Sequence, residues 1–237
     1  MTEAVSARAH FQPIVDVHRM RVVGFEALAR FDDGVSPLEH LRVAEERGAR
    51  EALELTLIEA AVDAAGDLPA EGFVTLNASG RTMSFPELAD VLRRVERSWG
   101  LELFEGAEPE ECLAVREQVD RLGGFLLIDD AGAGFADENR IRQLRPDIVK
   151  IDRSLFWQSL EGDDGRHRLE GILEAAREVG ARTLIEGVED AAQLDAVREL
   201  RADLAQGYHL GRPTAVDGVA EMLADLQRRV GVDAAGL

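Results

Sequence analysis

The chain has 237 residues, with 46 acidic and 27 basic side chains and a formal net charge of −19 at pH 7. This acidity argues against a DNA partner, because contacts with a phosphate backbone need lysine and arginine. The apolar share of 46% is sufficient for a core and excludes a wholly disordered chain.

No run of apolar residues approaches the length of about 18 that indicates a membrane-spanning helix. The single cysteine, Cys112, excludes a disulfide framework, and the first residues lack the basic and apolar parts of a signal peptide. The five histidines are not spaced as a zinc site requires. We therefore expect a cytoplasmic protein without a membrane span.

Short apolar runs alternate with helical patterns from one end of the chain to the other. Strands are predicted, in chain order, at 11–17, 22–29, 73–77, 101–105, 125–129, 148–152, 183–187 and 204–209. Helices are predicted from 36 to an interruption at 48, then at 51–65, from 84 towards 100, and at 109–122, 166–179, 190–200 and 216–230. Surface loops are expected at 32–34 and 161–165, with frayed ends up to about residue 9 and beyond about 231.

Repeated alternation of strands and helices is typical of parallel strands joined by crossover helices. About eight strands over this length predict an α/β fold with a closed (β/α)8 barrel, and an open doubly wound sheet is the structural alternative. No linker divides the chain, so we expect one domain over 9–231 with short tails at 1–8 and 232–237.

Polar side chains lie in nearly every predicted strand or just after it. They are acids, amides and the only lysine of the chain: Glu26, Asn77, Glu102, Glu105, Asp129, Asp130, Lys150, Asp152, Glu186, Glu189 and Gln206. In a parallel barrel the carboxyl ends of the strands meet at one face, which would bring these groups together. Carboxylates gathered so densely repel one another unless cations neutralise them, and oxygen ligands favour Mg²⁺ or Mn²⁺. The pattern predicts a metal site.

Each of these residues has a simpler interpretation when it is taken alone. An acid after a strand is often the N-cap of the next helix, and Asp129 and Asp130 before a glycine also suit a turn. Independent caps would not follow nearly every strand, so the whole set favours the metal site. Arg30 lies about 13 Å beyond Glu26 on the same strand face. We expect it to bind an anionic part of a ligand or to form a salt bridge.

Lys150 stands out because every other basic residue apart from the histidines is an arginine. A lysine offers a compact amine that can point at a small target such as a water molecule, and a guanidinium cannot replace it there. Codon bias is the alternative explanation. Trp99, Trp157 and Tyr208 are too scattered to form a stacking platform for bases, and we expect them to pack.

Together these residues resemble the EAL-domain family of cyclic di-GMP phosphodiesterases. The chain carries, in the family's order, the motifs Gln12-Pro13-Ile14, Glu26-Ala27-Leu28 followed by Arg30, Asn77-Ala78-Ser79, Glu102-Leu103-Phe104-Glu105, Asp129-Asp130-Ala131-Gly132-Ala133-Gly134, Lys150-Ile151-Asp152, Glu186-Gly187-Val188-Glu189, Gln206-Gly207-Tyr208 and Arg212-Pro213. The letters EAL alone are a weak signal, whereas this many motifs in order are a specific one.

The resemblance implies a TIM-like barrel whose first strand is antiparallel, and hydrolysis of cyclic di-GMP to linear pGpG with two divalent cations, Mg²⁺ or Mn²⁺. The resemblance also implies the ligands of these cations. The first cation would be held by Glu26, Asn77, Glu102 and Asp129, and the second by Asp129, Asp130 and Glu186. The catalytic residues that the resemblance implies are Lys150, Glu186, Glu189 and Gln206. Of these, Lys150 would contact the attacking water. Ligand or supporting contacts fall to Gln12, Arg30 and Asp152, and support of a loop to Glu105. A homodimer and a sensory or regulatory partner protein are also implied.

The chain departs from the family pattern in a loop that, in the family, couples metal binding to dimerisation. Ala131 and Ala133 replace the Phe and Thr of D-D-F-G-T-G, and Phe104 replaces the Thr of E-x-T-E. An active phosphodiesterase is therefore weighed against a catalytically weak or inactive domain that acts as a cyclic di-GMP receptor or protein-interaction module. A third hypothesis is an enolase-like barrel enzyme with Lys150 as its base. The complete set of carboxylates favours the first.

Overall fold

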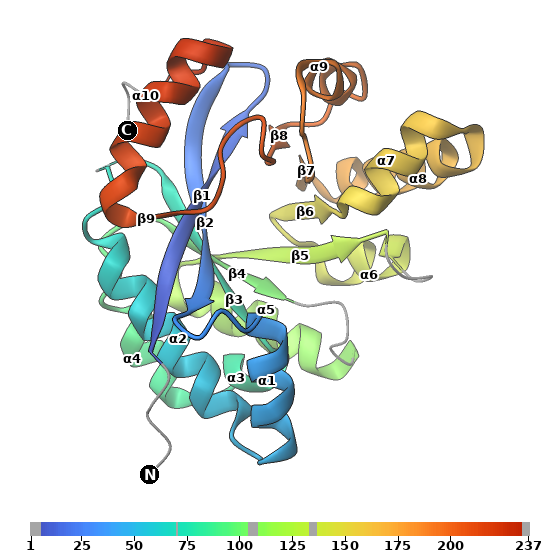
Figure 1. Ribbon diagram of the computed structural model, residues 1–237. Helices are drawn as coiled ribbons and strands as arrows, with labels where there is room; N and C mark the ends of the chain where they lie inside the picture. Colours follow the sequence, from blue (N-terminus) through green and yellow to red (C-terminus); the bar gives the residue numbers. More distant parts are fainter. Residues whose placement is uncertain (1–5, 70, 104–108, 133–136, 234–237) are drawn as a thin grey trace.

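The computed structural model describes residues 6–69, 71–103, 109–132 and 137–233. Within these ranges a nine-stranded sheet closes into a barrel (Figure 1). Its parallel strands follow one another in chain order: β2 (Arg21–Phe31), β3 (Phe73–Ala78), β4 (Trp99–Leu103), β5 (Phe125–Ala131), β6 (Ile148–Ile151), β7 (Arg182–Ile185) and β8 (Leu204–Ala205).

The first strand closes the barrel. β1 (Ala7–Asp16) pairs antiparallel with β2 on one side and with β8 on the other, and the short β9 (Thr214–Ala215) also pairs with it. The predicted TIM-like barrel with an antiparallel first strand is confirmed.

Helices lie around the outside of the sheet (Figure 1). They are α1 (Pro37–Glu46), α2 (Arg50–Ala65), α3 (Gly80–Met83), α4 (Pro86–Leu92), α5 (Pro109–Leu122), α6 (Asp137–Leu144), α7 (Arg153–Glu161), α8 (Asp163–Val179), α9 (Ala191–Glu199) and α10 (Val219–Val230), the last preceded by a 3-10 turn at Val216–Gly218. Most of the connecting helices return the chain from the carboxyl end of one parallel strand to the start of the next, as crossover connections must.

Aromatic rings fill the lower part of the barrel. Phe73 and Phe125 meet edge to face with their centroids 5.1 Å apart. Gly24 and Gly100 make room for them, because a Cβ at either position would approach one of these rings to within 2.6 Å. The two rings pack against the buried apolar residues of the barrel interior.

Several elements differ from the predictions. Helices α3, α6 and α7 and strand β9 were not predicted. The helix expected from 84 towards 100 ends at Leu92, and a turn leads from it to β4, which begins at Trp99. The expected loop at 161–165 was wrong. Only Gly162 separates α7 from α8, and Gly165 is buried where its α-carbon faces the backbone of Gln158.

Both ends of the described chain are paired further out than the expected frayed segments. Ala7 pairs with Phe31 in the first strand, and Asp233 forms a bridge with Arg21. Among the helices of the described ranges, none has the length and apolar character needed to cross a lipid bilayer.

Candidate active site

Two layers of side chains lie inside the barrel, one apolar and one polar. The apolar layer is a buried cluster: Ile14, Leu127, Ile148, Leu184 and Leu204. The polar layer lies two positions away on the same strands or just past their ends: Gln12, Asp129, Lys150, Glu186 and Gln206. Because side chains alternate along a strand, a step of two residues keeps the same face and moves towards the end of the barrel. The sequence of the strands therefore places the polar layer directly above the apolar one.

Lys150 is at the centre of the polar layer, with 1% of its side chain exposed. Its ammonium contacts four carboxylates: Glu102 Oε2 at 2.5 Å, Asp129 Oδ1 at 2.9 Å, Glu186 Oε1 at 2.9 Å and Glu26 Oε1 at 3.3 Å. These acids come from β2, β4, β5 and the residue that follows β7. The barrel thus gathers residues that are far apart in the chain around its only lysine.

Burial and mutual repulsion shift the titration of this cluster. Burial acts to lower the pKa of Lys150, but the surrounding carboxylates, led by Asp129 and Glu102, hold it well above its ordinary value. Burial raises the pKa of Glu102 well above its ordinary value, and it raises the pKa of Glu186 to about 7. One ammonium therefore does not neutralise the four acids, and the layer either retains protons or accepts further positive charge.

Amide side chains orient Glu26 from the other side. Gln206 Nε2 donates to Glu26 Oε2 at 2.6 Å and to Gln12 Oε1 at 3.0 Å. Gln12 Nε2 in turn donates to the carbonyl of Gly211 at 2.9 Å. Asn77 Nδ2 lies 3.5 Å from Glu26 Oε1, which is a long hydrogen bond. Gln206 thus fixes the rotamer of Glu26, and Gln12 holds Gln206 in place.

A second group of acids lies beside Lys150. Asp129, Asp130 and Glu186 each place one carboxylate oxygen within 4.8 Å of the others. The register of β5 against β6 shifts between Ile128 and Ala131, and Asp130 has a φ of 56°. An irregularity of this kind re-aims side chains at a strand end, which allows two consecutive acids to reach the same group.

The possible ligand atoms of this layer suit a hard divalent cation. They are carboxylate and amide oxygens, which Mg²⁺ and Mn²⁺ prefer. Among the described residues, Glu102 Oε1 is buried without a hydrogen-bond partner. A buried acceptor without a donor is costly unless something else satisfies it. The residues present therefore fit divalent cations.

A cavity of 640 Å³ opens over the polar layer. Arg30, Asp152 and Glu189 lie in its wall. The guanidinium of Arg30 donates to the carbonyl of Ala29 at 2.7 Å, and Asp152 caps α7 by accepting the N–H of Ser154 at 2.8 Å. Asp152 therefore has the helix-cap role as well as a place in the cavity. Glu105 lies outside the described residues, as do Phe104 and Ala133.

Some residues of the cavity wall were not predicted. Tyr208, which we expected to pack, is 48% exposed and lines the cavity, with the guanidinium of Arg212 4.0 Å from its ring centroid. Trp99 and Trp157 do pack against the core, as expected. Arg50, Glu54 and Ser79 also line the cavity. The sequence feature that could have pointed to Glu54 is an acid at helical spacing from the buried apolar residues Ile58, Ala61 and Val62 of α2.

A closed α/β barrel with a carboxylate-rich layer at the carboxyl ends of its strands defines the class: a TIM-like barrel protein with a candidate centre for divalent cations. Comparison with known proteins adds the family. The EAL domain model matches residues 3–213, and the chain belongs to the EAL domain family.

Relatives and solved structures agree with this assignment. The probable cyclic di-GMP phosphodiesterase PdeB of Escherichia coli is 27% identical over 84% of this chain and 41% of its own length. The MucR phosphodiesterase in complex with c-di-GMP has a TM-score of 0.79 at 24% identity and covers 90% of this chain and 99% of its own. BlrP1 of Klebsiella pneumoniae with manganese and cyclic di-GMP gives the same TM-score and identity over 90% of this chain and 57% of its own.

Sequence identity and coverage determine what these comparisons show. At 24% identity the two solved structures show a shared fold. The chain spans only 28% to 31% of the length of three other curated relatives, so those proteins contain much that has no counterpart in this sequence.

Proposed function

We propose that this protein hydrolyses cyclic di-GMP to linear pGpG with the help of two divalent cations. The observation that carries the proposal is the set of four carboxylates around Lys150, beneath a cavity of 640 Å³. Membership of the EAL domain family and the name of the E. coli relative support cyclic di-GMP as the ligand.

Two groups of side chains would each hold one cation. Glu26, Asn77, Glu102 and Asp129 would hold the first, and Asp129, Asp130 and Glu186 the second. Such cations would lower the pKa of a bound water and would stabilise charge on the attacked phosphate. Positive charge of this kind is also needed because a phosphodiester would otherwise meet a ring of carboxylates.

Lys150 would act as a fixed positive charge and hydrogen-bond donor. Since the surrounding acids hold its pKa well above its ordinary value, its amine keeps its protons at neutral pH. It would orient the attacking water or stabilise the leaving oxygen by donating to it. A role as a proton-abstracting base, which the enolase-like hypothesis requires, needs a neutral amine, and the surrounding carboxylates oppose its deprotonation.

The remaining residues would position the ligand and the metal-binding acids. Gln206 keeps Glu26 in its rotamer, and Gln12 supports Gln206, through the hydrogen bonds described above. Arg30 and Asp152 lie in the cavity wall, where they would meet the ligand, and Glu189 would support the site from the same wall. We extend the proposal to a cytoplasmic protein that works as a homodimer under a sensory or regulatory partner.

A receptor that binds cyclic di-GMP without cleaving it is the alternative. It is motivated by Ala131, which stands where the family has Phe and is buried in β5, paired with Ile151. This replacement leaves the neighbouring acids, Asp129 and Asp130, in one group with Glu186. Hydrolysis is therefore the better supported function.

Incubation of the purified chain with cyclic di-GMP and Mn²⁺ or Mg²⁺ tests the proposal, with EDTA as the control and chromatography of the nucleotides as the readout. We expect pGpG that depends on the metal and is lost in Glu26→Ala. Saturable binding without product would establish the receptor instead. Neither binding nor product would exclude both.

A further inference from the structure

Glu54 is a buried acid that the proposed reaction does not use. It lies on α2 among the buried residues Ile58, Ala61 and Val62, and 6% of its side chain is exposed. Burial of a carboxylate removes it from water and so costs free energy of folding, whereas burial of an apolar side chain at this position would not. The contacts of Glu54 indicate what offsets that cost.

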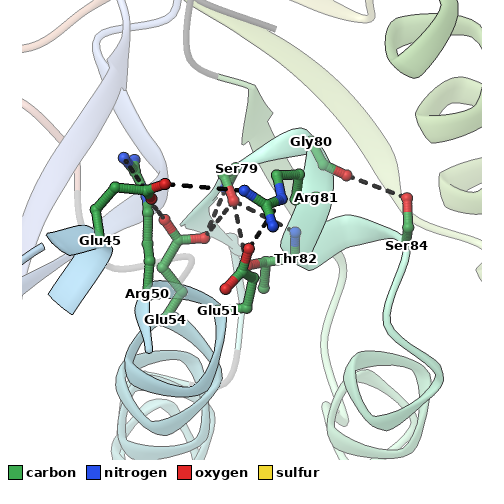
Figure 2. A network of polar contacts seen from close by, with 9 residues as sticks. All are labelled: Glu45, Arg50, Glu51, Glu54, Ser79, Gly80, Arg81, Thr82 and Ser84. Carbon is green, nitrogen blue, oxygen red and sulfur yellow. Dashed lines mark hydrogen bonds and ion pairs between the residues drawn. The ribbon is translucent and has the colours of Figure 1, made fainter. Parts of the chain in front are cut away.

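The carboxylate of Glu54 joins the turn that follows β3 to its own helix, α2. Its Oε2 accepts the N–H of Ser79 at 2.9 Å and the hydroxyl of Ser79 at 2.7 Å, and its Oε1 accepts Arg50 Nε at 2.8 Å. Figure 2 shows the carboxylate of Glu54 and Ser79 turned towards one another. Burial acts to raise the pKa of Glu54, but the hydrogen bonds from Arg50, Thr82 and Ser79 hold it below its ordinary value. The group is therefore an anion at neutral pH.

Ser79 determines where the chain goes after Asn77. It follows the last residue of β3, is the N-cap of α3, and accepts the N–H of Thr82 at 3.3 Å. Helix α3 has four residues, and so short a helix has little stability of its own. Pairing with β4 holds the backbone of β3 as far as Ala78, and Glu54 holds the next residue, Ser79, which lies two positions beyond the predicted metal ligand Asn77.

Asn77 needs such support. Its side chain is exposed, and its contact with Glu26 is a hydrogen bond of 3.5 Å. A contact of that length does not fix an amide. We propose that Glu54 is a positioning residue that holds Asn77 ready for a divalent cation by fixing Ser79 through two hydrogen bonds. This role rests on the proposed function in one respect, namely that Asn77 is a metal ligand.

The variant Glu54→Gln tests the role because a glutamine cannot reproduce the contacts. In either orientation its amide places N–H groups against a donor, either Ser79 or Arg50. The matched control is Glu51→Gln on the same helix, which removes an acid that pairs with Arg81 at 2.9 Å in the same network (Figure 2).

The readout is Mn²⁺ affinity, measured without nucleotide by the loss of the free Mn²⁺ resonance signal. Supporting residues of a metal site typically contribute 10- to 100-fold to affinity, and we expect a loss of about tenfold in Glu54→Gln. We expect less than about twofold in Glu51→Gln, because its acid does not contact Ser79. Ser79→Ala should weaken Mn²⁺ binding in the same direction, and the double variant should be no weaker than Glu54→Gln, since both changes break one contact.

Several outcomes would overturn the role. One is a Glu54→Gln protein that loses stability to urea yet binds Mn²⁺ as wild type does, because Glu54 would then be a tether of the fold alone. If that variant fails to fold, Ser79→Ala decides the matter by the same affinity measurement. Wild type that binds Mn²⁺ without hydrolysing cyclic di-GMP would contradict only the proposed function. Wild type that binds no Mn²⁺ would overturn the positioning role as well.

Discussion

Lys150 and Asp16 show, at the scale of single residues, two opposite ways of holding a buried charge. Lys150 is one ammonium shared among four carboxylates at the carboxyl ends of the parallel strands. Asp16, near the other end of the barrel, is one carboxylate shared among several donors. It accepts the N–H groups of His18 and Arg19, and it pairs with the guanidinium groups of Arg19 and Arg182. The first arrangement retains excess negative charge, and the second is satisfied within the protein.

Replacement of Lys150 by arginine keeps the charge but changes its shape. A guanidinium is planar and larger than an ammonium, so it cannot contact four converging carboxylates within 3.3 Å. We expect Lys150→Arg to lower turnover of cyclic di-GMP by about 100- to 1,000-fold, the usual effect of losing one well-placed donor. Initial rates with saturating Mn²⁺ give the measurement. Turnover within a few fold of wild type would show that Lys150 takes no part in the reaction.

Removal of the charge of Asp16 should reduce stability in a pH-dependent way. Burial acts to raise the pKa of Asp16, but hydrogen bonds from Arg19 and His18 hold it below its ordinary value. A depressed pKa in the folded state contributes stability above the unfolded pKa of about 4, and that contribution disappears as the pH falls through the folded value. We expect Asp16→Asn to cost about 1–3 kcal/mol at pH 7.

Urea denaturation of wild type and Asp16→Asn at a series of pH values checks this expectation. The difference in the free energy of unfolding should shrink steadily below about pH 4. A difference that stays constant down to the acid limit of the folded state would mean that the ionised form of Asp16 contributes nothing.

At the scale of elements, helices hold the loops that carry the site. Helix α7 does so for the residues after β7, because Trp157 Nε1 donates to the carbonyl of Gly187 at 3.0 Å. Arg153 of the same helix lies against Gly187, where a Cβ would come within 2.4 Å of the arginine Cβ. Glycine is thus required there by its φ of 72° and by this close approach. The position of Glu186 and Glu189 depends on a helix that the sequence reading did not predict.

The variant Trp157→Phe removes the hydrogen bond to Gly187 and keeps most of the packing. We expect a loss of about 1 kcal/mol in the free energy of unfolding, together with weaker Mn²⁺ binding, because the loop of Glu186 loses its anchor. Trp99→Phe is the control. Trp99 is the first residue of β4, and its ring packs over Gly124, away from the site. Equal Mn²⁺ affinity in the two variants would contradict the anchoring role of Trp157.

The alternation of strands was visible in the sequence because each strand carries a short run of apolar residues. The helices α6 and α7 were not visible for two different reasons. Helix α6 is mostly polar, and its apolar residues Ile141 and Leu144 are buried. In α7, the run of Leu155, Phe156 and Trp157 follows a strand so closely that helix and strand cannot be told apart by period.

The polar layer of the site could be predicted because its residues follow buried strands. Lys150, Asp129 and Glu186 all come two positions after an apolar residue of the barrel interior. Glu54 could not be found in the same way, since its partner Ser79 is 25 positions away and belongs to another element. Contacts between elements of this kind depend on how the helix packs, which a local pattern does not contain.

At the scale of the whole molecule, the barrel trades stability for a charged site. Four acids around one ammonium repel one another, and the residue Glu102 is buried with one oxygen that no donor among the described residues reaches. Natural proteins often retain such destabilising groups where function needs them. The rest of the barrel, with its apolar interior and helical cover, must supply the stability that the site lowers.

Neutralising one of these acids should therefore stabilise the protein when no metal is present. We expect Asp129→Asn to raise the free energy of unfolding in EDTA by about 1 kcal/mol and to abolish stabilisation by Mn²⁺. Wild type should gain about 2.7 kcal/mol for each cation site when Mn²⁺ is present at 100 times the dissociation constant of that site. Denaturation curves with EDTA and with Mn²⁺ give both quantities. An Asp129→Asn protein that is less stable than wild type in EDTA would show that Lys150 already balances the cluster.

The isolation of Lys150 has a practical consequence for chemical labelling. Amine-selective reagents have one side chain to modify in this protein, and it is 1% exposed at the floor of the cavity. Apart from the amino terminus, acylation would therefore report how often the barrel opens to solvent, without any engineered tag. The same scarcity leaves amine-to-amine crosslinkers with the amino terminus besides this buried side chain, so carboxyl or arginine chemistry is better suited to detecting a dimer.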